Sequence, residues 1–276
     1  MSLARPPLPA MLTAYIQGIG LIGPGLPDWE SGSRAIAGEE AYAPRATTLP
    51  APEGLPPAER RRTGATVKLA LGAAQQAVAA ADIDPRGLLA VFSSSGADGV
   101  ICHEICETLA STDRQVSPTR FHNSVHNAAA GYWSLATGAT AASTALCAYD
   151  GSFAAGLLEA LAVVTVDRVP VLLSAYETIY PEPLRAKRPL PDSFAVALVL
   201  TPAATPNTRA RLTASLHGSA AAPDRFPEPQ LEALRAAVPA ARSLPLLRLL
   251  ARREPGEVVV DYLGDQRLTV EVRECR

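Results

Sequence analysis

Apolar positions along this chain fall into two alternating patterns. Short runs of consecutive apolar residues, as at 88–96 and 169–177, are typical of buried strands. Longer segments between them repeat apolar residues every three or four positions, which is typical of helices that bury one face. The stretch 59–83 has the clearest repeat and predicts one long helix. Its apolar stripe consists of Val67, Leu71, Ala74, Val78 and Ala81.

The two patterns alternate over most of the chain and predict an α/β fold. Because strands that alternate with helices form parallel or mixed sheets, we expect a sheet with helices on both faces. The last two strands of the series are expected to form an adjacent hairpin. The predicted strands are 11–25, 88–96, 139–145, 169–177, 193–202 and 209–218. The predicted helices are 27–40, 59–83, 98–112, 151–164 and one that follows the loop beginning at residue 117.

Three regions depart from this alternation. Residues 1–10 are expected to form a flexible tail, and the lack of a long apolar stretch there argues against a signal peptide. Residues 43–58 carry five prolines and predict an extended surface loop. Residues 206–276 contain a proline-interrupted helical segment and then a hairpin that turns near Gly264. We therefore expect a tail, one domain at 11–205 and a shorter C-terminal part.

The composition narrows the class of protein. With 276 residues, of which 48% are hydrophobic, the chain is long enough to bury a large core. A net charge of −2 and an aromatic content of 5% argue against a nucleic-acid-binding protein. Four cysteines do not make a disulfide framework in a chain of this length, so we expect reduced thiols and a cytoplasmic location. No uncharged apolar run is long enough to predict a membrane span.

Two motifs resemble ligand sites but lack the context that such sites need. Residues 102–107, CHEICE, place two cysteines at i and i+4 of a helix, yet no second pair completes four ligands, so no metal is expected. The glycine-rich run GIGLIGPG at 18–25 follows a strand, but a proline-rich segment comes later where a dinucleotide site needs a helix and an acidic residue. No cofactor is therefore expected.

Polar and basic clusters leave alternatives open. The segment FHNSVHN at 121–127 holds two of the four histidines, and a histidine beside a thiol could act as a general base. Alternatively, its polar side chains satisfy buried backbone, with Asn123 or Ser124 as the N-cap of the next helix. Three arginine-rich clusters are either solvated surface or a face for an acidic partner. The first of them is Arg60, Arg61 and Arg62.

The segment STALCAYDGSFAAGLLEA at 143–160 raises the question of a nucleophile. It runs from a strand of small residues into a helix, and Cys147 lies close to the junction. An acyl-transfer enzyme places a thiol at such a junction, because the helix N-terminus lowers the pKa of the thiol. Cys147 is therefore one candidate nucleophile.

Four stretches together carry a family resemblance. They are VFSSSGADGV, SPTRFHNSVHNAAAGYWSLATG, STALCAYDGSFAAGLLEAL and VPVLLSAYE. Over about residues 11–205 the chain resembles the N-terminal half of β-ketoacyl synthases. It is most similar to the short ketosynthase-like chain length factors of bacterial aryl-polyene and related pigment clusters. The resemblance implies a thiolase-like fold, with a mixed five-stranded sheet, helices on both faces and a truncated C-terminal half.

The resemblance also places the nucleophile. When the ketosynthase Thr-Ala-Cys segment is laid on this chain without gaps from Glu177 backwards, Tyr149 falls at the nucleophile and Cys147 two residues earlier. A tyrosine, with a reference pKa of about 10, is a poor acyl acceptor at neutral pH. A shifted alignment would restore Cys147. Active ketosynthases supply two histidines from their C-terminal half, whereas residues 206–276 contain only His217. We therefore do not expect the chain to catalyse condensation alone.

The resemblance implies a heterodimer with a complete β-ketoacyl synthase, formed through about residues 115–147. The chain would shape the acyl tunnel of its partner in polyene, polyketide or fatty-acid-like biosynthesis. An acidic acyl carrier protein would deliver the growing chain, with Arg60, Arg61 and Arg62 as its expected contact. Two alternatives are a Cys147-dependent acyltransferase or ketosynthase and a non-enzymatic scaffold. The expected tunnel or interface residues are Phe121, His122, Asn123, His126, Asn127 and Trp133, with Tyr149 and Phe153 filling the vestigial pocket.

Overall fold

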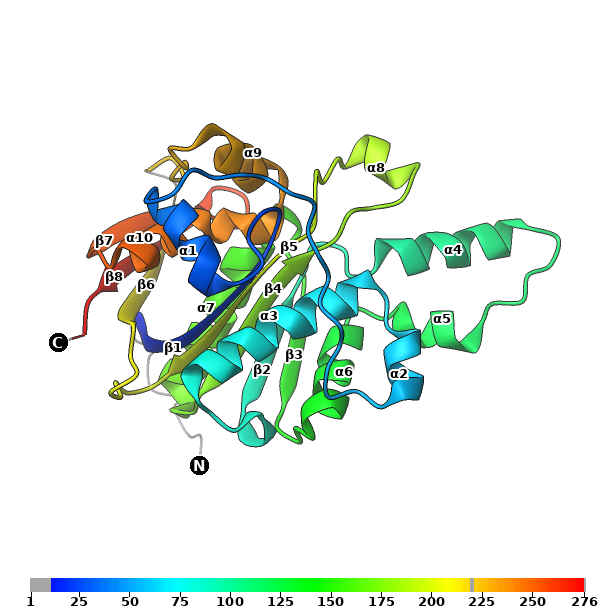
Figure 1. Ribbon diagram of the computed structural model, residues 1–276, viewed down its shortest axis with the longest axis horizontal. Helices are drawn as coiled ribbons and strands as arrows, with labels where there is room; N and C mark the ends of the chain where they lie inside the picture. Colours follow the sequence, from blue (N-terminus) through cyan, green and yellow to red (C-terminus); the bar gives the residue numbers. More distant parts are fainter. Residues whose placement is uncertain (1–10, 219–220, 276) are drawn as a thin grey trace, which may run out of the picture.

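The computed structural model of the chain describes residues 11–218 and 221–275. The flexible tail expected for residues 1–10 lies outside the described residues. Eight strands form one sheet in the order β3-β2-β4-β5-β1-β6-β8-β7 (Figure 1). The strands are β1 (Leu12–Ile22), β2 (Leu89–Ser93), β3 (Ser143–Leu146), β4 (Val171–Glu177), β5 (Phe194–Thr201), β6 (Ala210–Gly218), β7 (Gly256–Asp261) and β8 (Gln266–Arg273).

The mixed five-stranded sheet expected from the sequence is confirmed as one part of this larger sheet. Strands β3, β2 and β4 run parallel to one another, and β5 runs antiparallel to both of its neighbours, β4 and β1. The expected hairpin between the fifth and sixth strands is wrong, because β1 lies between them and pairs with both. The C-terminal hairpin is correct: β7 and β8 pair antiparallel, and β8 joins β6.

Helices cover both faces of the sheet, as expected. On one face α3 and α6 pack over Phe92 and Tyr176, and on the other α1, α7, α9 and α10 enclose a second core. The helices are α1 (Trp29–Ala37), α2 (Pro57–Arg62), α3 (Ala65–Ala81), α4 (Gly99–Ala110), α5 (Pro118–Asn123), α6 (Ala128–Thr137), α7 (Ser152–Asp167), α8 (Leu184–Lys187), α9 (Pro229–Ala237) and α10 (Leu244–Arg252). Short 3₁₀ turns are η1 (Pro85–Gly87), η2 (Tyr149–Gly151) and η3 (Pro239–Ser243).

The single helix expected at 59–83 is wrong, because the chain leaves the helical conformation between α2 and α3. Thr63 has extended backbone angles, and Gly64 precedes the first residue of α3. A Cβ atom at Gly64 would lie 2.8 Å from the Asp98 carboxylate. The break therefore makes room for the residue that caps α4, since Asp98 accepts a hydrogen bond from the Ile101 amide.

The glycine-rich run of β1 has a packing role. A Cβ atom at Gly18 would lie 1.9 Å from the carbonyl oxygen of Ala77, and one at Gly20 would lie 2.0 Å from that of Ala73. Only glycine at these two positions lets the backbone of α3 approach the sheet this closely. The run thus allows the close contact of β1 with α3.

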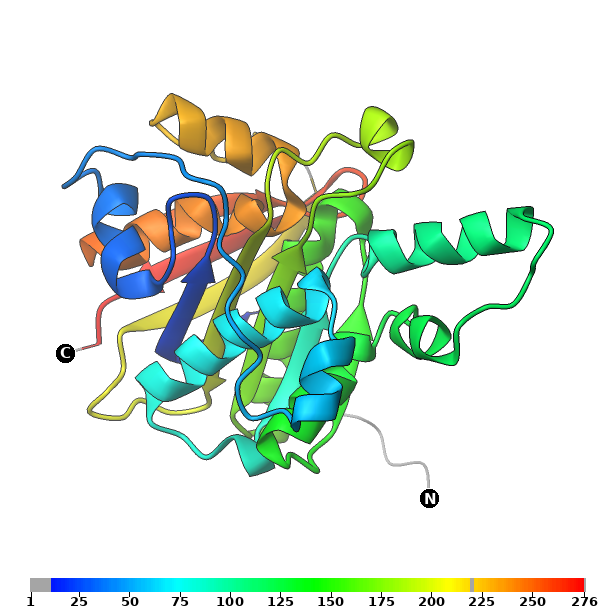
Figure 2. The same cartoon turned by 45° about the vertical axis from the view of Figure 1, so that its right-hand side comes forward.

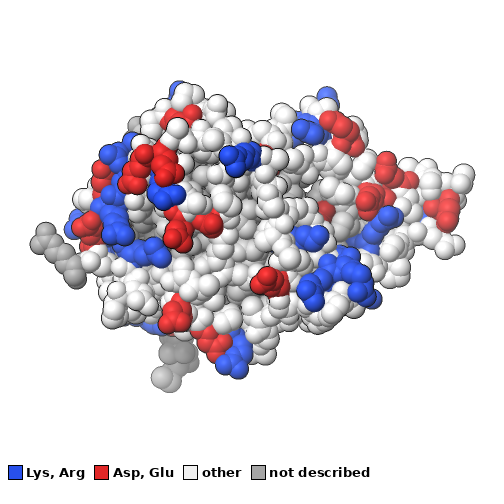
Figure 3. Space-filling model, in the orientation of Figure 1, with Lys and Arg blue, Asp and Glu red and all other residues white. Residues whose placement is uncertain are grey.

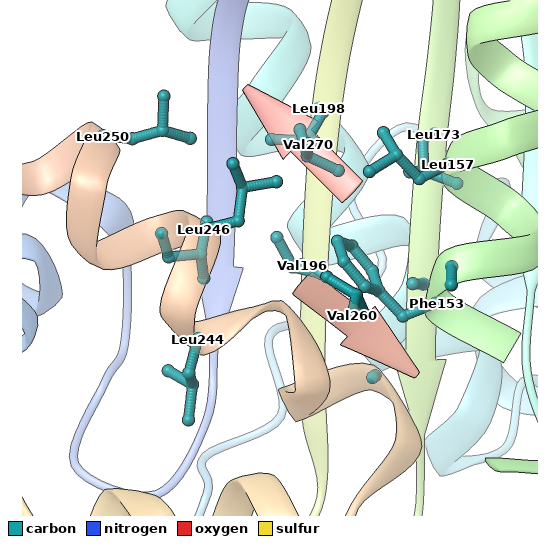
Figure 4. Close-up of a cluster of buried hydrophobic side chains, with 14 of the residues drawn as sticks. Phe153, Leu157, Leu173, Val196, Leu198, Leu244, Leu246, Leu250, Val260 and Val270 are labelled. Carbon is teal, nitrogen blue, oxygen red and sulfur yellow. The ribbon is translucent and has the colours of Figure 1, made fainter. Parts of the chain in front are cut away.

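Helix α7 lies in the middle of the molecule, between the sheet and the C-terminal segment. Phe153 and Leu157 point towards Leu173 and Val196 of the sheet and towards Val260 of β7 (Figure 4). By length and composition alone, residues 149–167 form one segment apolar enough to cross a membrane, and half of it is buried inside the structure. Its apolar character is accounted for by this packing, because a central helix buries apolar residues on several sides.

Helices α4 and α5 form an arm that extends from the sheet (Figures 1 and 2). Among the residues of α4, only Gly99 is buried, and Asn123 is the only buried residue of α5. Arg120 of α5 pairs with Glu104 of α4 at 2.8 Å and holds the two helices together. The arm therefore presents most of its side chains outside the core of this chain.

Candidate functional site

The carboxyl ends of three parallel strands meet at the N-terminus of α7. Strand β2 ends at Ser93, β3 at Leu146 and β4 at Glu177, and the chain enters α7 through η2. Ligand sites of α/β proteins occur at this edge, because loops that follow parallel strands gather there. This edge is therefore the candidate site.

Tyr149 occupies the turn that links β3 to α7. Its φ of +49° is in the left-handed region, which side chains other than glycine rarely adopt. The hydroxyl of Ser152 fixes the turn: it donates to the Tyr149 carbonyl at 2.7 Å and accepts from the Ala148 amide at 3.1 Å. Cys147 is exposed and lies between β3 and η2. The strained residue next to α7 is thus a tyrosine, and the cysteine precedes it by two positions.

An arginine holds the ring of Tyr149 from outside. The guanidinium carbon of Arg188 lies 3.9 Å from the centroid of the ring, and its Nη2 atom lies 2.7 Å from Oδ1 of Asp150. Such a cation–π contact is favourable and limits ring rotation. We expected Tyr149 and Phe153 to fill one pocket, but the structure separates them: Tyr149 is 63% exposed and Phe153 is fully buried.

The C-terminal segment closes one side of the site through a charge network. Arg242 of η3 lies 3.1 Å from Oδ2 of Asp150 and 3.2 Å from Oδ2 of Asp261. Arg267 pairs with the other oxygen of Asp261 at 3.5 Å. The carbonyl oxygen of Tyr262 lies so close to Gly151 that a Cβ there would be 2.7 Å away. Residues far apart in the sequence therefore fix the start of α7.

Replacing Arg242 by methionine is expected to lower the free energy of unfolding by about 2 kcal/mol, because Asp150 and Asp261 lose a shared cation. This loss of stability is smaller than the loss expected for a fully buried ion pair, because the Asp150 side chain is 43% exposed. Urea unfolding measures the change. Arg252→Met is the matched control, because Arg252 makes only a surface pair with Glu254. Equal losses in the two variants would contradict the network.

A buried carboxyl group lies at the end of β4. Glu177 is 2% exposed and accepts hydrogen bonds from the amide and the hydroxyl of Ser95, the latter at 2.8 Å. Burial raises the pKa of Glu177 to about 7. The hydrogen bonds from Ser95 lower this pKa, but their effect is smaller than that of burial. The Tyr180 hydroxyl lies 3.2 Å from the Ser95 hydroxyl. The sequence marked Glu177 only as an alignment position, and nothing in it indicated this polar cluster.

The segment at 121–127 reaches the same edge through His126. Nε2 of His126 lies 3.2 Å from the Ser94 carbonyl oxygen, just beyond β2. The expected N-cap role of Asn123 or Ser124 is wrong, since Asn127 occupies that position without a side-chain cap bond. Asn123 instead donates to the Arg62 carbonyl at 2.8 Å and accepts from the Tyr132 hydroxyl at 3.0 Å. It links α5 to α2 and α6.

The predicted interface residues divide into accessible and buried groups. Phe121 is 67% exposed, and His122 and Asn127 are also exposed. Trp133 is 1% exposed and packs against Phe92, with 6.5 Å between ring centroids. Like Phe153 and Asn123, it has almost no surface to offer a partner, because it faces the core of its own chain.

Strand β3 is the outermost strand of the sheet next to this site. The carbonyl oxygens of Ala142 and Leu146 accept bonds from β2, so the intervening Ser143 and Ala145 direct their amide and carbonyl groups away from it. In the described part of the chain, no other strand pairs with this edge. Such an edge is a template for another strand. Large exposed apolar side chains on the neighbouring α4, α5, α6 and connecting turns are Val100, Leu109, Phe121, Val125, Leu135 and Tyr149.

A basic patch lies beside the arm. Arg60, Arg61 and Arg62 end α2 and form a patch of positive charge over that helix (Figure 3). Arg62 forms an ion pair with Glu59 at 2.9 Å. Among the described residues, this is the only ion pair that any of the three arginines makes. In the same described part of the chain, no group of three histidine, cysteine or acidic side chains is arranged to hold a metal ion.

Comparisons with solved structures show the fold. A ketosynthase (ApeO) in complex with its chain length factor (ApeC) from Xenorhabdus doucetiae matches with a TM-score of 0.70 and 24% identity, over 94% of this chain and 99% of the matched one. The ishigamide ketosynthase/chain length factor matches with a TM-score of 0.73 and 14% identity, over 96% and 100%. A type II acyl-carrier protein in complex with its ketosynthase, AntDE:AntF, matches with a TM-score of 0.72 and 11% identity, over 96% of this chain and 99% of the matched one.

A comparison with curated proteins finds no match. The family described as "Beta-ketoacyl synthase, N-terminal domain" matches residues 33–248, which include β2 to β6, α7 and the strained turn at Tyr149. The thiolase-like arrangement expected from the sequence is therefore present. This chain belongs to the β-ketoacyl synthase family through that N-terminal domain.

Proposed function

We propose that this chain is the non-catalytic chain length subunit of a heterodimeric β-ketoacyl synthase. The observation that carries the proposal is the residue at the strained turn before α7. Tyr149 has a φ of +49° and an arginine stacked on its ring, at the position where the family resemblance places a nucleophilic cysteine. A phenol with a reference pKa of about 10 is a poor nucleophile at neutral pH.

The histidines support the same proposal. Decarboxylative condensation needs proton transfer and stabilisation of an oxyanion. His217, the only histidine after residue 205, is exposed on β6 and lies 2.6 Å from the Ser215 hydroxyl. His126 contacts a backbone carbonyl of the β2 edge, and His122 is exposed on the arm. The described residues thus bring no pair of histidines to Tyr149.

The free edge of β3 and the arm suit a partner of the same fold. The edge carries small residues, Ser143 and Ala145, which allow a second backbone to approach closely. Phe121, Val125 and Leu135 are exposed apolar side chains nearby, and isolated proteins rarely leave such patches uncovered. The partner would supply the cysteine and histidines, and His122, His126 and Asn127 would line the shared tunnel.

The basic patch on α2 is proposed as the contact for an acidic acyl carrier protein in the cytoplasm. Arg60, Arg61 and Arg62 lie on a helix that Asn123 ties to the arm, so the patch would lie beside the subunit interface. Opposite charges on the two proteins would raise the association rate, and salt would weaken it. The carried chain would be a polyene or related acyl group.

Co-expression with the β-ketoacyl synthase encoded nearest to this chain tests the proposal. We expect a 1:1 complex in size-exclusion chromatography with light scattering, and product formation only when both subunits are present. The variant Cys147→Ser is expected to form the complex and to keep product yield within about two-fold, because Cys147 is outside the strained turn. A loss of product in Cys147→Ser at unchanged complex formation would instead support the Cys147-dependent acyltransferase. If this chain does not form a complex with the synthase, the result would favour the alternative of a non-enzymatic scaffold.

A further inference from the structure

A cavity on the side of the molecule remote from the arm has no role in the proposed function. It lies where α1, β1 and α10 meet, has a volume of about 520 Å³, and adjoins a second cavity of about 370 Å³. Both are lined by Ile19, Trp29, Arg209, Leu250 and Arg253. Their size lies in the range of small-molecule sites.

The apolar part of this cavity is rigid. Ile19 is 2% exposed and Leu250 is 9% exposed, so both belong to the core and present only a small surface to the cavity. Trp29 is half-buried and packs against the same core at the start of α1. A flat aromatic side chain beside aliphatic ones forms a wall on which a ring can stack.

Two arginines with anchored backbones supply the positive charge of the lining. The Arg209 amide donates to the Ile16 carbonyl at 2.8 Å, immediately before β6. Arg253 is the C-cap of α10 and has a φ of +52°, a conformation that glycine adopts more readily, and its amide bonds to the last turn of that helix. A cation is favourable at a helix C-terminus.

The two guanidinium groups repel one another. The pKa of Arg209 is lowered by burial and by the charge of Arg253. In the described part of the chain, neither arginine has a carboxylate partner within 4.0 Å. Three carboxylates also line the cavities: Asp28 and Glu30 line the first and Glu274 lines the second. Asp28 accepts bonds from the Ser31 amide and hydroxyl. An anion between the arginines would relieve this repulsion.

We propose that this cavity binds an organic phosphate that carries a flat ring, with the phosphate between Arg209 and Arg253 and the ring against Trp29 and Leu250. Two guanidinium groups that line the same cavity can bind the several oxygens of a phosphate. The wall of Trp29 supplies contact area that an inorganic anion cannot use. This inference is independent of the heterodimer, because none of its residues is on the arm or the β3 edge.

Calorimetric titration of the full chain with adenosine monophosphate tests the inference. We expect saturable binding that weakens about 10- to 100-fold in the double variant Arg209→Met/Arg253→Met, because two charge-assisted contacts are lost. The matched control is Arg252→Met, which removes a neighbouring charge that does not line either cavity. Trp29→Leu is expected to weaken binding less than the double variant does.

Two further probes separate the parts of the ligand. Adenosine lacks the phosphate, inorganic phosphate lacks the ring, and both are expected to bind more weakly than the nucleotide. Equal affinity for adenosine would overturn the anion site, and equal affinity for inorganic phosphate would overturn the ring contact. Absence of nucleotide binding at millimolar concentration, or binding that the double variant leaves unchanged, would overturn the whole inference.

Discussion

Replacing Ala145 by proline is expected to abolish the complex with the partner synthase while this chain stays folded. The alternation along β3 turns the amide of Ala145 away from β2, so proline removes a donor from the free edge and no bond within the chain. Its ring would also obstruct a strand approaching that edge. We expect the dissociation constant to rise on the order of 100-fold or more, because a partner strand paired with this edge would lose its donor.

Two variants make this result interpretable. Ala145→Ser keeps the edge amide and a small side chain, and should bind the partner as the natural chain does. Thr144→Pro acts on a residue whose backbone faces β2, so it should destabilise the chain itself. Sedimentation or light scattering at micromolar concentration gives the assembly state, and circular dichroism gives the fold. A folded Ala145→Pro variant that still forms the complex would show that the interface lies elsewhere.

Replacing Glu177 by glutamine is expected to change how stability depends on pH. The pKa of Glu177 is raised to about 7 by burial, from an ordinary value of 4.5. Below pH 4.5 the group is protonated whether the chain is folded or unfolded. Between pH 4.5 and 7 it ionises mainly in the unfolded chain, so the natural protein loses stability as the pH rises. Above pH 7 its contribution no longer changes.

The glutamine variant lacks this titration and can still bond to both groups of Ser95. Its stability relative to the natural chain should therefore rise by about 3 kcal/mol between pH 4.5 and 7.5 and then level off. Urea unfolding at a series of pH values measures the difference. Glu39→Gln, at an exposed position, is the matched control for the loss of one carboxylate. A difference that does not change with pH in Glu177→Gln would contradict the burial argument.

The sequence predicts the local elements well because each one has its own signal. Apolar runs located β2, β4 and β5, and the helix expected at 27–40 is α1, which is capped by Asp28 and Gly38. Strand pairing was harder to predict, because β6 follows β5 in the chain but pairs with β1. The local sequence pattern also does not indicate which strand forms a free edge of the sheet. The break before α3 depends on Asp98, which lies 34 positions after Gly64.

The candidate site was only partly predictable for a similar reason. Counting back from Glu177 placed Tyr149 at the junction before the helix, and in the structure it begins η2, directly before α7. Trp133 was assigned to a tunnel because an aromatic residue on a helix gives no sign of whether it faces its own core or a partner. The contacts of Asp150 with Arg188 and Arg242 join three separate segments, so they become visible only when the chain is folded.

The most direct test of the proposed function is the intact mass of both subunits taken from the complex during turnover. We predict that the acyl group is found on the partner synthase alone, and that the mass of this chain is unchanged. Thiol-directed inhibitors of ketosynthases should likewise modify the partner and leave its acyl-transfer cysteine blocked. An acyl thioester on Cys147, formed and discharged at the rate of product formation, would contradict the account.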